Sequence, residues 1–394
     1  METVNQKTAA EYQKQHSFEE FKSKNKDVVR LQTERVLRAL AQPALKLDFA
    51  NKTTPSAEII NKVKHDLTVE KGAHCDTPRF MITEFIADEL RTIDDVDLPR
   101  YLYHRYRYDI FPLTRTLDEY PPYLQIEPSS ICNFKCVFCY QTDESFNSRG
   151  SGMLGTISLD LFKRIADEVE GKVEFISLAS RGEPLVSKEI TGIFEYSRGK
   201  FLGLKLNTNA SLMNEKIAHA ILSGGVNTVV FSADAAEEPL YSKLRVNGSL
   251  ERTVKNIEMF ENIRAKHYPD SKLITRVSGV KVNELQDMGK MIGFWGDRVD
   301  QVAFVKYNPW ENVYEAAPND VALPCSDLWR RMFIWYDGQT NPCDSDYKSH
   351  LAVGNALKNT VSELWLSEGY KALRAAHLGN ERQSVEPCRR CYVV

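Results

Sequence analysis

The chain has 394 residues, and its 51 basic and 54 acidic side chains give a formal net charge of −3. This length allows a sizeable core and more than one domain, while the near balance of charge excludes a general electrostatic binder of nucleic acid. No apolar stretch approaches the length of a membrane span and the start of the chain is too polar for a secretion signal, so we expect a soluble, cytoplasmic protein. Thiols stay reduced in that compartment, so the eight cysteines are better candidates for metal ligands than for disulfides.

Residues 1–118 are predicted to form a helical extension. Ser17–Glu20 matches a capping box ahead of a helix with apolar residues between Val28 and Leu40, and Thr54–Pro55 begins a second helix. Arg100–Tyr108 alternates aromatic and basic residues, which is compatible with stacking on a nucleotide but more typical of a helix packed on the next domain. In the absence of a more specific signal, we expect this extension to act as a lid or brace on the next domain.

From Tyr123 onward, short β-rich runs alternate with amphipathic helices. The predicted strands are residues 123–127, 173–179, 202–207, 226–231, 273–281 and 301–307. The predicted helices between them are residues 159–171, 188–197, 214–222, 249–266 and 284–294. Six strands joined by helical crossovers imply parallel pairing with right-handed connections. The predicted fold class is therefore α/β, a partial (β/α)6 TIM-like barrel over residues 119–310, with its chemistry on the loops after the strand ends.

Cys132, Cys136 and Cys139 lie within eight residues, in a C-x3-C-x2-C loop directly after the first predicted strand. Three thiolates on one short loop can bind three irons of a cubane cluster and leave the fourth iron open. A zinc site fits less well, because zinc takes four ligands and typically pairs C-x2-C units. Followed by Tyr140, the loop resembles that of the radical S-adenosylmethionine (SAM) family. The resemblance implies that SAM binds the open iron and yields a 5'-deoxyadenosyl radical, which takes a hydrogen atom from a substrate.

A second motif lies one β/α unit later, at the end of the second predicted strand. Gly182, Glu183 and Pro184 match the last three residues of the family's Gly-Gly-Glu-Pro segment, which binds the methionine amine of SAM, and Arg181 replaces its first glycine. A carboxylate can accept a hydrogen bond from the ammonium group, and glycine lets the backbone approach the ligand. Without this placement, the tetrapeptide would be an ordinary turn.

The same resemblance indicates further SAM contacts. Tyr140 is one. Asn207 and Asn209 follow the third strand in a turn similar to the family's Asn-Thr-Asn-Gly, although they could also serve only the loop backbone. Ser232 and Arg245 match a Ser-x-Asp and arginine pattern, for which a helix cap and a surface arginine are the plain alternative.

Cys325, Cys343, Cys388 and Cys391 form a second group, with Gly338 five residues before Cys343. This pattern resembles the auxiliary-cluster tails called SPASM and twitch domains, closest to enzymes of the deoxy-scyllo-inosamine dehydrogenase type. The resemblance implies a small domain at residues 311–394 that binds one auxiliary 4Fe-4S cluster, with a zinc ribbon as the alternative.

A cluster with four thiolate ligands binds substrate poorly but can accept an electron. This favours a radical SAM oxidoreductase that dehydrogenates a small polar metabolite, such as a sugar or cyclitol. Lys306, Tyr307 and Glu311, near the sixth strand, are candidates for the required base. A flavodoxin or ferredoxin is the expected electron donor, and neither nucleic acid nor membrane is an expected partner.

Three alternatives stay open. Modification of a ribosomally made peptide is second, because such tails also serve those enzymes. Epimerisation usually needs a cysteine as hydrogen-atom donor, and there is none from Tyr140 to Pro324, which leaves only the isolated Cys75. A zinc-bearing or electron-carrying scaffold without catalysis would leave the Gly182–Pro184 motif unexplained.

Overall fold

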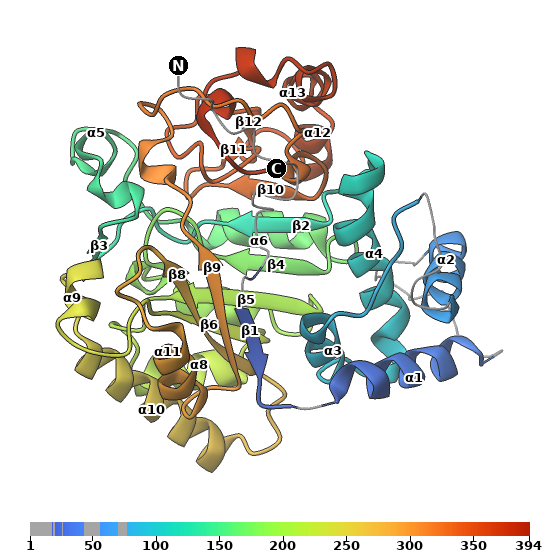
Figure 1. Ribbon diagram of the computed structural model, residues 1–394, viewed down its shortest axis with the longest axis horizontal. Helices are drawn as coiled ribbons and strands as arrows, with labels where there is room; N and C mark the ends of the chain where they lie inside the picture. Colours follow the sequence, from blue (N-terminus) through green and yellow to red (C-terminus); the bar gives the residue numbers. More distant parts are fainter. Residues whose placement is uncertain (1–17, 19, 26, 43–55, 70–76) are drawn as a thin grey trace.

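The computed structural model describes residues 18, 20–25, 27–42, 56–69 and 77–394. Its centre is a curved ten-stranded sheet (Figure 1), whose strands follow the order β1-β9-β8-β6-β5-β4-β2-β10-β11-β12. The strands predicted for the barrel are present as β2 (Tyr123–Ile126), β4 (Phe175–Leu178), β5 (Gly203–Thr208), β6 (Thr228–Ser232), β8 (Ile274–Lys281) and β9 (Gln301–Lys306). They pair in parallel in sequence order. The predicted α/β partial barrel is confirmed.

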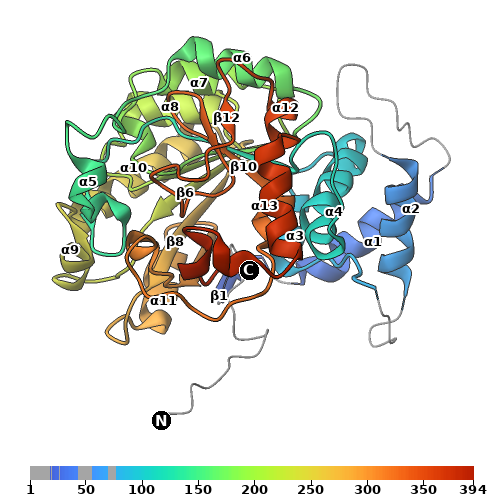
Figure 2. The same ribbon diagram turned by 90° about the horizontal axis from the view of Figure 1, so that it is seen from above.

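The crossover helices lie on the outer face of this sheet (Figure 2). They are α6 (Leu159–Val169), α7 (Ile190–Tyr196), α8 (Glu215–Ser223), α10 (Leu250–His267) and α11 (Met288–Gly296). Four of them begin at a side-chain cap, provided by Ser158, Asn214, Ser249 and Asp287. A short α9 (Leu240–Leu244) precedes α10, and α5 (Glu144–Asn147) follows the first cysteine loop.

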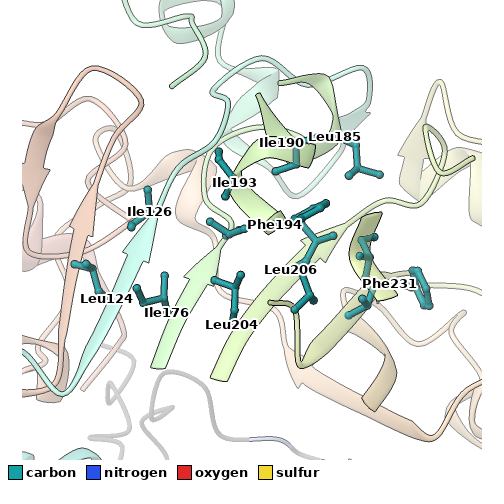
Figure 3. Close-up of a cluster of buried hydrophobic side chains, with 14 of the residues drawn as sticks. Leu124, Ile126, Ile176, Leu185, Ile190, Ile193, Phe194, Leu204, Leu206 and Phe231 are labelled. Atoms are coloured by element: carbon teal, nitrogen blue, oxygen red, sulfur yellow. The ribbon is translucent and has the colours of Figure 1, made fainter. Parts of the chain in front are cut away.

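The main core lies between the sheet and these helices. Ile193 and Phe194 of α7 face Leu204 and Leu206 of β5 (Figure 3), and all four are fully buried. Because side chains alternate along a strand, the residues between these leucines point the other way, and Lys205 lines a cavity inside the barrel. One face of each strand therefore stabilises the fold and the other forms the site.

The N-terminal extension contributes a strand as well as helices. β1 (Glu20–Ser23) pairs antiparallel with β9. The capping box predicted at Ser17–Glu20 is therefore wrong for Glu20, which lies in a strand and not in the first turn of a helix. Ser17 and Glu19 lie outside the described residues. The open edge of β9 offers unpaired backbone groups, and pairing with them prevails over the local cap signal. The two predicted helices are present as α1 (Val28–Leu40) and α2 (Ala57–Thr68).

The extension closes the end of the barrel where the strands begin. α3 (Glu84–Leu90) and α4 (Leu98–Thr114) pack there. His104 stacks on Phe175, the first residue of β4, with ring centroids 4.1 Å apart. Arg100 donates two hydrogen bonds to Glu174, at 2.9 and 2.6 Å. The aromatic and basic run at 100–108 is thus a buried helix packed on the barrel, as the preferred interpretation predicts.

The C-terminal segment extends the same sheet on its other side. β10 (Arg331–Ile334) pairs in parallel with β2, and β11 (Gln339–Asn341) and β12 (Gly354–Asn355) continue from it. The helices α12 (Val361–Trp365) and α13 (Glu368–Leu378) pack beside these strands (Figure 1). Two further short strands, β3 (Lys135–Cys136) and β7 (Arg245–Val246), pair with each other outside the main sheet. Among the described residues, no helix combines the length and apolarity needed to cross a bilayer.

Candidate active site

A cavity of about 860 Å³ runs through the barrel. Its lining extends from the cysteine loop, where the parallel strands end, to Tyr123 and Arg331, where β2 and β10 begin. A volume of this order holds a ligand of cofactor size with a small second molecule. The sequence predicts that the catalytic groups lie on the loops after the strand ends, and the cysteine loop lies there.

All three thiols of the cysteine loop line this cavity. The N–H of Phe134 donates to the Cys132 sulfur at 3.4 Å, and an Arg245 N–H donates to the Cys136 sulfur at 3.8 Å. Burial raises the pKa of all three thiols, to about 12 for Cys132, so iron would have to displace their protons. None of the described side chains forms a group suited to a single metal ion, whereas a cubane needs only one thiolate for each iron. Three cavity-facing thiols with donors on two of the sulfurs fit such a cluster.

Arg245 is held beside the loop by a buried ion pair. Its Nε lies 2.5 Å from Asp234 Oδ2, and the other oxygen of Asp234 accepts the N–H of Val280 at 2.7 Å. The guanidinium therefore has its partners within the protein and places a positive charge beside the sulfur of Cys136. Ser232 lines the cavity from β6.

The Gly182–Pro184 segment packs directly on the backbone ahead of Cys132. The N–H of Glu183 donates to Ile131 O at 3.0 Å. A Cβ on Gly182 would lie 2.5 Å from the carbonyl oxygens of Ser129 and Ile131, so glycine is required by the close approach. Pro184 begins a short 3-10 turn and does not line the cavity, whereas Gly182 and Glu183 do.

The carboxylate of Glu183 is buried yet largely satisfied. It accepts hydrogen bonds from Thr208 Oγ1 at 2.7 Å, the Asn209 N–H at 2.7 Å and the Leu185 N–H at 3.1 Å. A carboxylate has roughly four acceptor positions, which leaves room for one further donor from the cavity. Burial raises the pKa of Glu183, and an ammonium group bound there would favour the ionised form.

The two asparagines after β5 differ in their surroundings. Asn209 Nδ2 donates to Asn133 Oδ1 at 2.9 Å, so it fixes the cysteine loop as well as lining the cavity. The side-chain oxygen of Asn207 is buried, has no hydrogen-bond partner among the described residues and faces the cavity, which makes it available to a ligand. Tyr140 donates to Ser180 O at 2.9 Å.

The four cysteines of the second group are partly buried, and they lie close enough for their thiolates to act on one another electrostatically. Burial and the neighbouring groups raise the pKa of Cys343 well above its usual value, and Cys325, Cys388 and Cys391 are among those neighbours. Their loops are held by Arg382, a fully buried residue that sequence analysis missed. Its guanidinium donates to the carbonyl oxygens of Leu323, Cys388, Cys391 and Val393. Four neighbouring thiols on a fixed backbone fit a second cluster.

Comparison with known proteins agrees with both cysteine sites. The model of the radical SAM superfamily matches residues 126–288. The chain therefore contains a radical SAM domain. A second family model, the iron-sulfur cluster-binding SPASM domain, matches residues 325–392. SAM and a 4Fe-4S cluster for the radical SAM domain, and an auxiliary iron-sulfur cluster for the SPASM domain, are thus its cofactors.

Individual relatives of this radical SAM protein are distant. The AdoMet-dependent heme synthase of Methanosarcina barkeri is 28% identical over 166 residues, which are 42% of this chain and 45% of the relative. The GTP 3',8-cyclase of Campylobacter lari is 28% identical over 178 residues, 42% and 53% of the two chains. The chain thus spans about half the length of these curated relatives.

Solved structures show the likeness of fold. Streptococcus suis SuiB bound to S-adenosylmethionine superposes with a TM-score of 0.51 at 15% identity, covering 75% of this chain and 77% of SuiB. SuiB bound to its precursor peptide SuiA gives 0.51 at 14% identity, covering 87% and 84%.

In this radical SAM domain, Arg181 replaces a glycine of the family motif and has a structural role that sequence analysis did not find. The guanidinium donates twice to Glu127, at 2.7 Å each, and once to the carbonyl of Tyr347 at 3.0 Å. It also lies 4.3 Å from the ring centroid of Trp335. Arg181 thereby connects the end of β2 with the SPASM domain.

The two cluster sites share an aromatic cluster. It consists of Tyr140, Phe146 and Tyr347 with Val313, and both Cys139 and Cys391 pack against it. The rings of Tyr140 and Tyr347 stack with centroids 4.8 Å apart. One cysteine of each group thus contacts the same set of side chains.

The candidates for the base lie at the edge of this arrangement. Lys306 is exposed, and the hydroxyl of Tyr307 contacts the Glu311 carboxylate. None of the three lines the cavity, although Val305 and Trp310 of the same segment do. Their assignment stays a prediction. Cys75 lies outside the described residues.

Proposed function

We propose that this radical SAM protein is an oxidoreductase that dehydrogenates a small polar metabolite and passes one electron to the auxiliary cluster. The observation that supports it most is the aromatic cluster around Tyr140 and Tyr347. Because Cys139 and Cys391 both pack against it, a radical formed near the first cluster would lie close to an electron acceptor.

The shape of the cavity supports a small substrate. α3, α4 and β1 close its far end, and Phe21, Phe85 and Tyr108 from these elements line it. Its wall also contains uncharged polar groups suited to hydroxyls, among them Asn207, Ser232 and Ser278. A cavity that is closed at its far end and carries such groups in its wall fits a sugar or cyclitol better than a long chain.

The cofactors supply hydrogen-atom abstraction through a 5'-deoxyadenosyl radical. Dehydrogenation removes one hydrogen atom, one proton and one electron from the substrate, and the electron is assigned to the auxiliary cluster. The protein's own residues fix this geometry: Glu183 and Asn207 offer polar atoms to the bound ligands, and Gly182 keeps their loop against the cysteine loop. A flavodoxin or ferredoxin would supply the electron that starts each turnover.

Peptide modification is the second candidate, supported by the fold shared with SuiB, which has been solved with its precursor peptide. Epimerisation is less well supported, because the only thiols among the described residues that line the cavity are those of Cys132, Cys136 and Cys139. A cluster ligand cannot readily donate a hydrogen atom.

The decisive experiment measures 5'-deoxyadenosine and oxidised product together, with reconstituted protein, SAM, a reductant and a panel of sugars and cyclitols. The proposal predicts one product for each 5'-deoxyadenosine. A C343S/C391S variant, which removes two auxiliary ligands, should still cleave SAM but form no oxidised product, whereas C136S should do neither. Oxidised product from the C343S/C391S variant at the wild-type ratio would refute the role of the auxiliary cluster, and 5'-deoxyadenosine without oxidised product in the wild type would refute dehydrogenation.

A further inference from the structure

The far end of the cavity, opposite the cysteine loop, is rich in positive charge. Lys205 of β5, Arg276 of β8 and Arg331 of β10 all line it. They come from three different strands, and Arg276 and Arg331 are at least nine-tenths buried. We call these three residues the basic floor.

The two arginines of the basic floor are fixed by uncharged neighbours, whereas Lys205 only lies over an aromatic ring. Arg331 donates two hydrogen bonds to the hydroxyl of Tyr108, at 3.0 and 2.6 Å. Arg276 donates to the side chain of Gln301 at 2.7 Å. Lys205 has no hydrogen bond to any described residue, and its ammonium lies 5.8 Å from the ring centroid of Tyr123, over which the guanidinium of Arg331 lies at 4.6 Å.

No carboxylate of the described residues lies within ion-pair distance of these three cations. The other lining arginines differ in this respect: Arg105 is paired with Asp109 at 2.9 Å and Arg330 with Asp327 at 3.3 Å. Glu89 is the acid whose charge acts on both Lys205 and Arg276, but its carboxylate accepts from Tyr101 at 2.8 Å and burial raises its pKa.

Unpaired charges in a buried cavity are costly unless a ligand or water satisfies them. The buried Arg100, Arg181 and Arg245 are paired with carboxylates, and the buried Arg382 donates to four backbone carbonyl groups. The three cations of the basic floor have neither a paired carboxylate nor such a set of carbonyl acceptors among the described residues, so their preferred ligand is an anion.

We propose that Lys205, Arg276 and Arg331 form a subsite for the oxyanion of the substrate, a phosphate ester or a carboxylate. The subsite rests on the proposed function and narrows its substrate class from polar metabolites to anionic ones. The anionic group would bind at the floor, and the carbon that loses hydrogen would lie toward the cysteine loop. Arginine favours such planar, multi-donor recognition of oxyanions.

The test is a binding experiment without turnover. Reconstituted full-length protein with SAM and no reductant is titrated calorimetrically with glucose, glucose 6-phosphate and glucuronate, and then with inorganic sulfate as a competitor. We expect the two anionic probes to bind and glucose not to bind, with sulfate competing against both. Preference for glucose 6-phosphate identifies a phosphate subsite, and preference for glucuronate a carboxylate subsite.

Substitution of Lys205 locates the binding. K205M removes the charge but no hydrogen bond to a described residue, and it should weaken the binding of the preferred anion roughly tenfold or more. K205R should restore most of that loss, and K216M, an exposed position on α8, should leave binding unchanged.

Three outcomes would overturn the subsite: equal binding of glucose and the anions, no competition by sulfate, or wild-type anion affinity in K205M. If K205M fails to fold, competition by sulfate in the wild type still shows whether the anion subsite exists. Because no turnover is measured, a result that refutes the subsite would leave the proposed dehydrogenation untested and standing, whereas anion binding without any oxidation would refute the proposed function alone.

Discussion

Replacement of Gly182 by alanine is expected to weaken SAM binding by displacing the segment that positions Glu183. The added Cβ would lie 2.5 Å from the carbonyl oxygens of Ser129 and Ile131, whereas ordinary contact begins at 3.4 Å. The two backbone segments must therefore separate by about 0.9 Å, the difference between these distances. Neither is a flexible side chain that could rotate away.

The energetic consequence follows from this overlap. Overpacking of a tight site costs about 1–3 kcal/mol, and separation would also lengthen the 3.0 Å hydrogen bond from Glu183 to Ile131. Since Ile131 immediately precedes Cys132, both the carboxylate and a cluster ligand would move. We expect G182A to fold with a lower Tm and to lose roughly tenfold in SAM affinity, which corresponds to about 1.4 kcal/mol.

The assay is equilibrium binding of SAM to the reconstituted protein, with iron content measured on the same samples. G293A is the matched control, because a Cβ on Gly293 in α11 meets no atom within 4 Å. It should match the wild type in affinity and, as an alanine in a helix, be slightly more stable. Wild-type SAM affinity and Tm in G182A would refute the reasoning.

Three other perturbations have clear expected outcomes. R382Q should remove hydrogen bonds to four carbonyl groups and lower the iron content from about eight to about four per chain, whereas R389Q, at a half-exposed ion pair, should keep both clusters. Wild-type iron in R382Q would contradict that structural role. Burial, followed by the charges of nearby arginines, lowers the pKa of Lys205 to about 7. The groups that act on its charge are Arg331, Arg276, Tyr108 and Glu89. Because an anion binds the protonated amine, sulfate affinity should be highest below pH 7 and fall as the pH rises through 7, and K205R should remove this dependence; a flat wild-type titration would contradict it. R181G, which restores the glycine typical of the family, should lower the free energy of unfolding by about 3–5 kcal/mol, because the buried Glu127 loses its partner. Adding E127Q should recover part of that loss, and equal stability of R181G and the wild type in denaturant titrations would show that the pair is unimportant.

Local patterns predicted much of this molecule. The six barrel strands, their order and their parallel pairing follow from alternating β-rich and amphipathic segments, and the spacing within the two cysteine groups predicted the radical SAM and SPASM regions that the family models match. These signals lie within short stretches of the chain, so little knowledge of distant contacts was needed.

What could not be predicted depends on pairing between distant segments. β1 forms because the edge of β9 is open, and β10 joins β2 although the two strands lie far apart in the sequence. The roles of Arg181 and Arg382 depend on partners that only the fold brings together. The basic floor likewise brings together residues of three strands. In the sequence, each of these residues has no pattern around it that distinguishes it from an ordinary charged residue.

The parallel pairing of β10 with β2 also determines how the chain can be divided. Removing residues 311–394 would expose the edge of β2, whose residues Tyr123–Ile126 are all buried. Such a bare, apolar edge is a template for aggregation. The barrel expressed alone should therefore precipitate, and expression trials would succeed only with both cluster regions in one chain.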